Sequence, residues 1–291
     1  MNNIVILTTI FKQPEKIVDD YFESLLNQSF KFFDVILIDD GCDNISEKIC
    51  KYKSLNIKVF EGTGSIPKNR SLMIEKAMTQ GYEKLIFCDF DDAQSTNRVE
   101  IATELLSKYD LIVNDVTPFN SSGVIERNVL SKRFVNGSRI TLDEILDFNF
   151  IGFSNSAINA SVVDFLDFSF PDELIAVDWY FFSRILLKNI SSVFTSEATT
   201  FYRQHETNII GIGNFNEQVF KNTLKVKRVH YIALASCSLF FSEKLIRIES
   251  LQRLVDLKDP YIDKLIEFNK RQQSTLLWWE LREEIYEVDK R

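Results

Sequence analysis

Residues 85–94 read LIFCDFDDAQ, an apolar run that ends directly in three aspartates, Asp89, Asp91 and Asp92. Clustered carboxylates repel one another, and leaving them unpaired beside a buried strand is costly. A hard divalent cation is the usual remedy, because an Asp-x-Asp pair supplies the oxygen ligands that such ions prefer. The simpler alternative is a solvated turn that caps the next helix, since Asp92 and the residues after it favour helix N-termini. Three carboxylates placed directly after an apolar strand favour a functional site.

Short apolar runs alternate with helical periodicity on both sides of this segment. Residues typical of strands are 4–7, 35–38, 57–60, 85–88 and 111–113, and residues typical of helices are 14–26, 43–52, 67–78 and 98–106. Strands that recur with helices between them predict βαβ crossovers, and therefore an α/β fold with a mostly parallel central sheet and flanking helices. Ligands of such sheets bind beyond the carboxyl ends of the strands. The polar residues expected there include Thr8, Thr9, Asp39, Asp40 and the three aspartates.

The regular alternation ends near Asp115. Residues 118–140 indicate a hairpin or an extended excursion, and the following patterns predict a strand at 151–160, a helix at 177–188 and a strand at 193–202. From Asn214 to the end the pattern is mostly helical, with one proline and no glycine. We therefore expect one α/β domain over residues 1–213 and a helical C-terminal region over residues 214–291.

Composition and charge exclude several other classes of protein. The chain holds 34 Lys and Arg against 42 Asp and Glu, a net charge of −8, whereas a general nucleic-acid binder needs a basic face. The N-terminus has no basic region before its short apolar run, so it predicts a buried strand and not a signal peptide. Four cysteines without CxxC spacing predict reduced, buried thiols in a cytoplasmic protein.

The aspartate box resembles the corresponding segment of two known families. In the haloacid-dehalogenase-like phosphatases, a strand ends in a similar Asp-x-Asp, and the resemblance would make Asp89 the nucleophile and Asp91 the acid/base. The inverting glycosyltransferases of family 2, which have the Rossmann-like GT-A fold, also end a strand in Asp-x-Asp. There the aspartates hold the ribose, the metal and the diphosphate of a sugar nucleotide. The box alone does not separate the two families.

Most of residues 3–212 is similar to the glycosyltransferase family. The opening IVILTTIFKQP looks like the first strand and the small polar turn that receives the nucleoside, which implies roles for Thr8 and Thr9. FDVILIDDGCDN resembles the second strand and its Asp-Asp-Gly-Ser end, although Cys42 stands in place of the serine. The resemblance implies that Asp39 and Asp40 hold the base, and a carboxylate can accept the N3–H of uracil or thymine.

A third block, PKNRS at residues 67–71, is similar to the family's Ala-Arg-Asn-x-Gly segment. Lys68 would replace the arginine on the phosphate side, and Asn69 matches the family's asparagine. The order and spacing of these blocks are more specific than any one of them. The phosphatase family explains none of them, and it usually places its box near the start of a domain.

DELIAVDWYFFSRILLKN, residues 172–189, resembles the Glu-Asp-Trp helix that supplies the catalytic base in this family. Asp178 and Trp179 match, whereas Val177 stands where glutamate is common. A general base must lie within hydrogen-bond reach of the acceptor hydroxyl, and the resemblance assigns that role to Asp178. The alternative is a first-turn carboxylate that only complements the helix dipole.

FYRQHETNIIG, residues 201–211, looks like the family's Tyr-Arg-Gln-His-x-x-Asn motif. The resemblance makes His205 a metal ligand beside Asp89 and Asp91, because imidazole is a good ligand for Mn²⁺. Arg203 would face the diphosphate, since a guanidinium can bind it with two parallel hydrogen bonds. The second histidine, His230, lies in a basic helical run and is interpreted as a surface or packing residue.

Together these resemblances imply a metal-dependent, inverting glycosyltransferase that uses Mn²⁺ or Mg²⁺. Residues 1–117 would bind the nucleotide, where Asp89 also contacts the donor, and residues 118–213 would serve the acceptor and catalysis. The donor would be a nucleoside diphosphate sugar, with UDP or dTDP favoured. The acceptor would be a glycan or a lipid-linked glycan in surface polysaccharide biosynthesis. The alternatives are the phosphatase and a non-catalytic protein that binds sugar nucleotides.

The C-terminal region differs from the rest of the chain in charge. Residues 215–291 hold 14 basic and 12 acidic side chains, whereas residues 1–214 hold 20 and 30. A basic stretch at 225–228 precedes an apolar one, which indicates peripheral attachment to the inner face of an anionic membrane, or else packing against the catalytic domain or a second copy of the chain. An acidic catalytic half still binds a diphosphate when a divalent cation inverts the local field.

Overall fold

The computed structural model describes residues 2–164, 169–204, 215–273 and 276–285. Contacts divide the chain into two compact units. The first, here called the sheet unit, comprises residues 1–141, 151–172 and 185–206, and the second, the helical unit, comprises residues 142–150, 173–184 and 207–291. The domain boundary expected at residue 213 stays a prediction.

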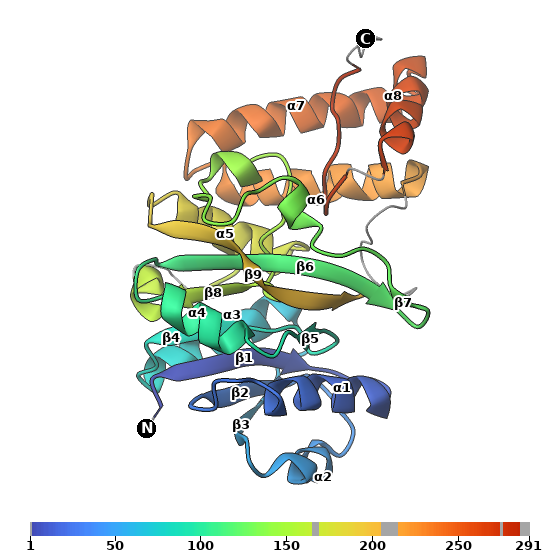
Figure 1. The fold of residues 1–291 in the computed structure, drawn as a ribbon. Helices are drawn as coiled ribbons and strands as arrows, with labels where there is room; N and C mark the ends of the chain where they lie inside the picture. The colour runs from blue at the N-terminus through green and yellow to red at the C-terminus, as the bar shows by residue number, and fades with distance from the viewer. Residues whose placement is uncertain (1, 165–168, 205–214, 274–275, 286–291) are drawn as a thin grey trace. The chain divides into compact units, whose positions relative to one another are not determined.

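Nine described strands form one sheet in the sheet unit (Figure 1). Their order is β3 (Asn56–Glu61), β2 (Asp34–Asp39), β1 (Ile4–Ile10), β4 (Lys84–Phe87), β8 (Ser156–Asn159), β6 (Leu111–Asn120), β9 (Ser192–Arg203) and β5 (Ala93–Gln94), with β7 (Gly123–Val124) paired to β6. The first four strands are parallel, and β9 is parallel to β6. Only β8, β5 and β7 pair in the antiparallel sense. The predicted mostly parallel α/β sheet is confirmed.

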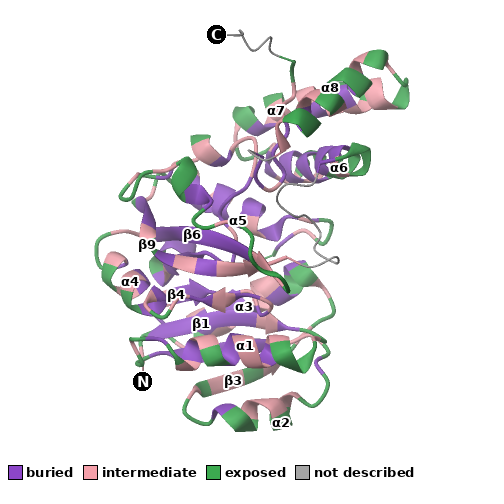
Figure 2. Ribbon diagram, turned by 45° about the vertical axis from the view of Figure 1, so that its right-hand side comes forward, coloured by how far each residue is buried: buried purple, intermediate pink, exposed green. Residues whose placement is uncertain are grey.

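Helices of the sheet unit cover the two faces of this sheet. On one face, α1 (Glu15–Leu26) and α4 (Arg98–Leu105) pack on alternate residues of the central strands and form a continuous apolar core. Both helices lie on the viewer's side of the sheet in Figure 1. α3 (Ile66–Thr79) contacts β1 and β2, and none of its buried side chains belongs to this core. Because successive strand residues point to opposite faces, α3 covers the other face of the sheet. Figure 2 shows the central strands β1, β4 and β6 buried along most of their length.

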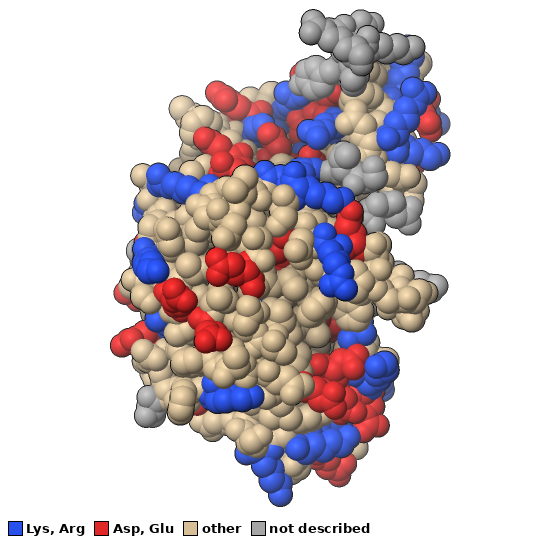
Figure 3. Space-filling model, viewed as in Figure 1, with Lys and Arg blue, Asp and Glu red and all other residues tan. Residues whose placement is uncertain are grey.

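The outer surface of α1 is charged. Lys16 pairs with Asp20 along the helix, and Lys51 pairs with Glu15 from the neighbouring segment. Figure 3 shows acidic and basic side chains close together on this face of the sheet unit. Such exposed pairs contribute little to stability, so the buried face of α1 holds the helix in place.

The helical unit holds most of α5 (Val177–Leu186), together with α6 (Glu217–Leu234), α7 (Leu239–Asp256) and α8 (Pro260–Arg271). Polar side chains accept hydrogen bonds from the first turns of the last three helices: Asn216 caps α6, Ser238 caps α7 and Asp259 caps α8. α6 contacts α7, and α7 contacts α8. Single 3₁₀ turns occur at Cys50–Tyr52, Leu130–Lys132, Asp143–Ile145 and Ala160–Val163.

Two predicted elements are shorter than the sequence pattern indicated. The helix expected at 43–52 is reduced to α2 (Ile45–Ile49) and one 3₁₀ turn, because none of the α2 residues is buried and Asn44 has a left-handed backbone with φ of 55°. The strand expected at 151–160 begins only at Ser156. The Asn155 side chain accepts a hydrogen bond from the Gly152 N–H at 2.8 Å, and this local turn takes the place of strand pairing.

All four cysteines are free thiols. Cys42 and Cys88 are buried as predicted, but the expectation was wrong for Cys50 and Cys237, which are exposed. Among the described residues, no helix combines the length and the hydropathy needed to cross a membrane.

Candidate active site

The register of the parallel strands brings their polar ends to one edge of the sheet. Thr9 of β1 pairs with Ile38 of β2, one residue before Asp39. On the other side of β1, Leu7 pairs with Phe87 of β4, and the Cys88 N–H donates to the Leu7 carbonyl at 2.9 Å. Three adjacent strands therefore bring the two threonines, Asp39 and the aspartate loop at 89–92 to the same edge of the sheet.

A glycine-containing loop after β3 holds the two aspartates at the end of β2. The Gly62 N–H donates to the Asp39 carbonyl at 2.8 Å, and the Gly64 N–H donates to the Asp40 carboxylate at 2.9 Å. A Cβ atom at Gly62 would lie 2.7 Å from the Asp39 carbonyl oxygen, so only glycine fits this approach. The Asp39 carboxylate also accepts from the Cys42 N–H at 2.8 Å. Sequence reasoning missed Gly62, although its position directly after a strand was a usable signal.

The first turn of α3 places Lys68 and Asn69 at this edge. Ser65 caps the helix, and the buried Asn69 side chain accepts hydrogen bonds from the Thr63 N–H at 2.7 Å and the Thr63 hydroxyl at 2.9 Å. Lys68 is more than half exposed and forms an ion pair with Asp172 at 2.9 Å. Asn69 is therefore fixed by the loop, whereas Lys68 reaches outward from it.

Arg70, which sequence reasoning did not select, contacts the aspartate box directly. Its guanidinium forms an ion pair with the Asp89 carboxylate and lies over the Phe153 ring, 4.9 Å from the ring centre. The Arg70 side chain is 16% exposed, and its Nη1 is buried without a hydrogen-bond partner among the described residues. A buried guanidinium nitrogen that lacks an acceptor indicates a place where an anionic ligand can bind.

Asp92 has a structural role in the box. Its side chain is buried, accepts a hydrogen bond from the Ser154 hydroxyl, and accepts another from the Arg203 N–H at 2.8 Å. Burial raises the pKa of Asp92 well above its usual range, and the nearby negative charges of Asp91 and Asp89 raise it further. The raised pKa favours the neutral form of Asp92, so the negative charge of this loop rests with Asp89 and Asp91.

Arg203, at the end of β9, fastens the aspartate loop to its surroundings. Its guanidinium donates to the Asp91 carbonyl at 2.8 Å and pairs with the Asp20 carboxylate of α1 at 2.8 Å. The same group lies over the Phe119 ring, 4.5 Å from its centre. Arg203 therefore lies at the aspartate box, and its predicted role on the diphosphate side stays a prediction.

A second buried arginine supports the end of β4, directly before the aspartate box. Arg98, at the start of α4, is 1% exposed and donates to the Phe87 carbonyl at 2.8 Å and to the Asn114 side chain at 2.8 Å. It also donates to the Cys88 sulfur at 2.9 Å. These contacts fix the end of β4 just before Asp89. The sequence carried no signal for this role, because an arginine in a first helical turn usually faces solvent.

Asp89 and Asp91 have the donor chemistry that suits a divalent cation. Mg²⁺ is commonly held by one or two carboxylates together with substrate phosphates, and the charge on this loop favours such an ion. Among the described residues, no group of three or more histidines, cysteines and acids is arranged to hold a metal. His205, the third predicted ligand, lies outside the described residues. Two carboxylates with donor phosphates thus fit the cation, and the three-ligand set stays a prediction.

Asp178 lies in the first turn of α5, in the helical unit. Its carboxylate accepts a hydrogen bond from the Trp179 N–H at 2.7 Å, and it is neither fully buried nor fully exposed. The Trp179 indole is buried and donates to the Ile145 carbonyl at 2.7 Å. The Asp178 carboxylate is therefore attached to a rigid aromatic residue at the start of a helix.

Comparisons with known proteins agree with this architecture. TarS from S. aureus in complex with UDP-GlcNAc matches with a TM-score of 0.64 and 18% identity, over 92% of this chain and 79% of that chain. The mannosyltransferase PcManGT from Pyrobaculum calidifontis, in complex with GDP-Man and Mn²⁺, matches with a TM-score of 0.55 and 9% identity, over 81% of this chain and 64% of that one. These structures share the GT-A fold with this chain. A comparison with curated protein sequences gave no match.

The sequence itself identifies the family. The family model described as "Glycosyl transferase family 2" matches residues 5–166, which is more than half of the 291-residue chain. The match includes β1, β2, α3 and the aspartate box, and it decides against the phosphatase interpretation of Asp89 and Asp91. The chain belongs to glycosyl transferase family 2 and has the GT-A fold.

Proposed function

We propose that this protein transfers a sugar from a nucleoside diphosphate sugar to an acceptor hydroxyl, with inversion at the sugar carbon. The observation that carries this proposal is the meeting of Asp39, Asp40, Asp89 and Asp91 with the guanidinium of Arg70 at one edge of the sheet. A sugar nucleotide requires carboxylates that bind the nucleobase and a divalent metal ion, and a buried positive side chain that binds phosphate. The TarS complex with UDP-GlcNAc supports a UDP-type donor.

In this proposal each strand end serves one part of the donor. Asp39 and Asp40, held by the loop at Gly62 and Gly64, orient the base, and Thr8 and Thr9 lie beside it. Asp89 and Asp91, with His205, would hold Mn²⁺ or Mg²⁺, which would supply positive charge to stabilise the leaving diphosphate. Lys68 and Arg203 supply positive charge on the diphosphate side.

Other buried donors at the same edge support a polar ligand. The Thr9 hydroxyl and the Asn69 side-chain nitrogen are buried without a hydrogen-bond partner among the described residues. Buried polar atoms are nearly always paired in proteins, so unpaired ones at a strand edge fit a site that a ligand completes. Both residues belong to the predicted nucleotide-binding set.

Asp178 takes the proton from the acceptor hydroxyl as that hydroxyl attacks the sugar from the face opposite the diphosphate. A single general base is sufficient for such a direct displacement, which inverts the configuration. The acceptor is proposed to be a glycan or a lipid-linked glycan in surface polysaccharide biosynthesis. Leu239 and Phe240, at the start of α7, are exposed and support the expected contact of residues 214–291 with a membrane or a second copy.

We expect UDP to stabilise the protein only when Mn²⁺ is present. With both ligands at about 100 times their dissociation constants, the melting temperature should rise by about 5 °C, because ligands that bind only the folded state stabilise it by mass action. EDTA should remove the shift, since Asp89 and Asp91 need the cation to hold a diphosphate. Thermal-shift measurements with UDP and GDP, with and without Mn²⁺, check this result.

The variant Asp91→Asn should lose the Mn²⁺-dependent shift, whereas Asp256→Asn should keep it. Asp256 is an exposed acid at the end of α7, so it controls for the loss of one negative charge. Hydrolysis of a generic phosphomonoester without any nucleotide effect would contradict the proposal. Nucleotide binding without release of UDP from any UDP-sugar would instead indicate the non-catalytic sugar-nucleotide protein.

Replacing Arg70 by glutamine should raise the dissociation constant for UDP with Mn²⁺ at least about 10-fold. A hydrogen bond to a charged group contributes about 1.5–3 kcal/mol, and Arg70 has a buried nitrogen available for the donor phosphate. Arg70→Lys should bind with intermediate affinity because it keeps the charge and loses the planar fork. Arg228→Gln, at an exposed arginine of α6, is the control. Isothermal titration checks these values. Tighter binding by Arg70→Gln would show that Arg70 only pairs with Asp89 and contributes nothing to donor binding.

A further inference from the structure

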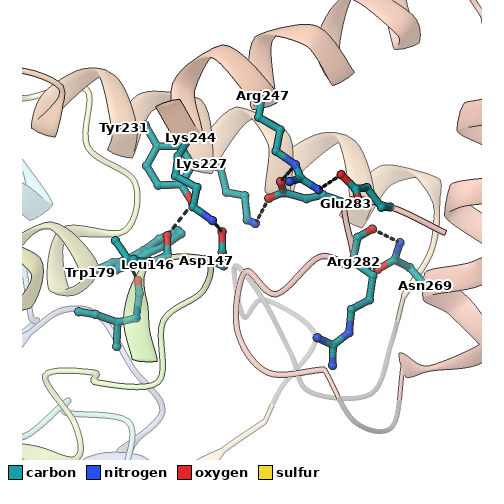
Figure 4. Close-up of polar contacts among 12 residues, drawn as sticks. Leu146, Asp147, Trp179, Lys227, Tyr231, Lys244, Arg247, Asn269, Arg282 and Glu283 are labelled. Atoms are coloured by element: carbon teal, nitrogen blue, oxygen red, sulfur yellow. Dashed lines mark hydrogen bonds and ion pairs between the residues drawn. The ribbon is translucent and has the colours of Figure 1, made fainter. Parts of the chain in front are cut away.

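α6 presents an aromatic face to the segment that carries Asp178. His230 of α6 stacks on Trp179, with ring centres 3.9 Å apart and planes inclined by 17°. The next residue, Tyr231, donates its hydroxyl to the Leu146 carbonyl at 2.8 Å, and Figure 4 shows this contact. All these residues belong to the helical unit. α6 therefore holds both Trp179 and the segment to which the Trp179 indole is bonded.

His230 has no polar partner that would explain it as a hydrogen-bonding residue. It is 1% exposed, and neither ring nitrogen has a hydrogen-bond partner among the described residues. Burial lowers the pKa of His230 well below its usual range, and the Lys227 ammonium one turn earlier lowers it further. Besides Trp179, the ring faces Tyr231 and Phe241 edge-on. His230 is thus a neutral, flat ring whose broad face is used by Trp179.

Trp179 is held through its ring and its indole N–H, and its backbone in turn contacts Asp178. Its ring lies on His230, its indole N–H is bonded to the Ile145 carbonyl, and its backbone N–H donates to the Asp178 carboxylate at 2.7 Å. The stack therefore restrains the residue whose backbone N–H donates to that carboxylate. Catalysis is sensitive to such shifts, since a displacement of about 1 Å can cost about 100-fold in rate.

We infer that His230 is a positioning residue for Asp178: through its stack on Trp179 it fixes the orientation of the Asp178 carboxylate. The helix that carries His230 lies outside the region matched by the family model. This inference rests on the proposed role of Asp178. His230 touches neither donor nor acceptor in it, and acts only through the stack. In this role the flat shape of the His230 ring matters, and its ability to carry charge or to form hydrogen bonds does not.

The variants His230→Ala and His230→Phe separate this role from a general contribution to folding. His230→Ala should lower the turnover of a UDP-sugar about 10- to 100-fold, with the dissociation constant for UDP and Mn²⁺ unchanged within about twofold. His230→Phe keeps a flat ring and should restore turnover to within about twofold. Leu224→Ala, at a fully buried leucine of α6, is the matched control for lost packing, and it should lower the melting temperature while turnover persists.

Hydrogen exchange of the Trp179 backbone amide tests the stack without any activity. Exchange should be faster in His230→Ala and close to wild type in His230→Phe. Unchanged exchange in His230→Ala, or equal losses of turnover in His230→Ala and Leu224→Ala, would overturn the inference. If the wild-type protein releases UDP from no UDP-sugar, the proposed function fails, and the exchange measurement still decides whether His230 holds Trp179 in place.

Discussion

Asp178→Asn should reduce sugar transfer by about 100- to 10,000-fold and leave donor binding intact. General bases contribute about 100- to 10,000-fold, and an amide cannot take the proton of the acceptor hydroxyl. The asparagine oxygen can still accept the hydrogen bond that the Trp179 N–H now donates to Asp178 at 2.7 Å, so the start of α5 should keep its geometry. Release of UDP from a UDP-sugar measures transfer, and titration with UDP and Mn²⁺ measures binding.

The matched control is Asp263→Asn. Asp263 is likewise an acid in the first turn of a helix of the same unit, α8, so its loss removes a comparable interaction with a helix dipole. Both variants should lose at most about 1 kcal/mol of stability on that account. If Asp178→Asn keeps most of its turnover, Asp178 serves only as a helix-terminal charge.

The parallel part of the sheet was predictable because each strand carries its own signal. The apolar runs of β1, β2 and β4 are buried on both faces, so they are apolar throughout and end abruptly at polar residues. That abrupt end also located Thr9, Asp39 and the aspartate box. The insertion of β8 between β4 and β6 was not predictable, since its four residues obtain their direction from pairing with both neighbours.

The parts of the site that the sequence did not reveal are defined by contacts over long sequence separations. Arg98 is buried under the box because it finds acceptors at Phe87, Asn114 and Ser156, which lie on three different strands. Arg70 was missed because α3 gives no local sign that its fifth residue faces a carboxylate 19 positions later. The hydrophobic periodicity of a sequence describes one helix or strand at a time. It therefore does not reveal a residue whose role depends on contacts with three elements.

His230 illustrates the same limit in the helical unit. Its basic helical neighbourhood indicated a surface or packing residue, and the packing alternative is the correct one. The neighbouring Lys227 was expected in a basic face that attracts an anionic membrane, yet its side chain is 0% exposed and pairs with Glu283 at 2.7 Å. A charge that is buried and paired does not attract a membrane surface, so any membrane contact must use other residues of the C-terminal region.

Glu283→Gln should destabilise the helical unit by about 3–5 kcal/mol, because breaking a buried ion pair leaves one charge without compensation. The Glu283 carboxylate, which is 7% exposed, accepts from Lys227 at 2.7 Å and from the Arg247 Nε at 2.6 Å, and Figure 4 shows both contacts. The glutamine keeps the size of the side chain and removes its charge, so Lys227 becomes an uncompensated buried cation. Urea denaturation followed by circular dichroism measures the change as a lower midpoint.

The neighbouring residue provides the control for this prediction. Glu284 is 52% exposed and pairs with the same Arg247 at 2.8 Å, so Glu284→Gln should cost no more than about 1 kcal/mol. The double variant Lys227→Met with Glu283→Leu should recover most of the lost stability, because apolar side chains of similar volume often replace a buried ion pair without loss. Equal midpoints for Glu283→Gln and Glu284→Gln would mean that burial of Lys227 does not depend on Glu283. A large difference, removed by the double variant, would show that the ion pair fastens residues 276–285 to α6 and thereby supports the helix that carries His230.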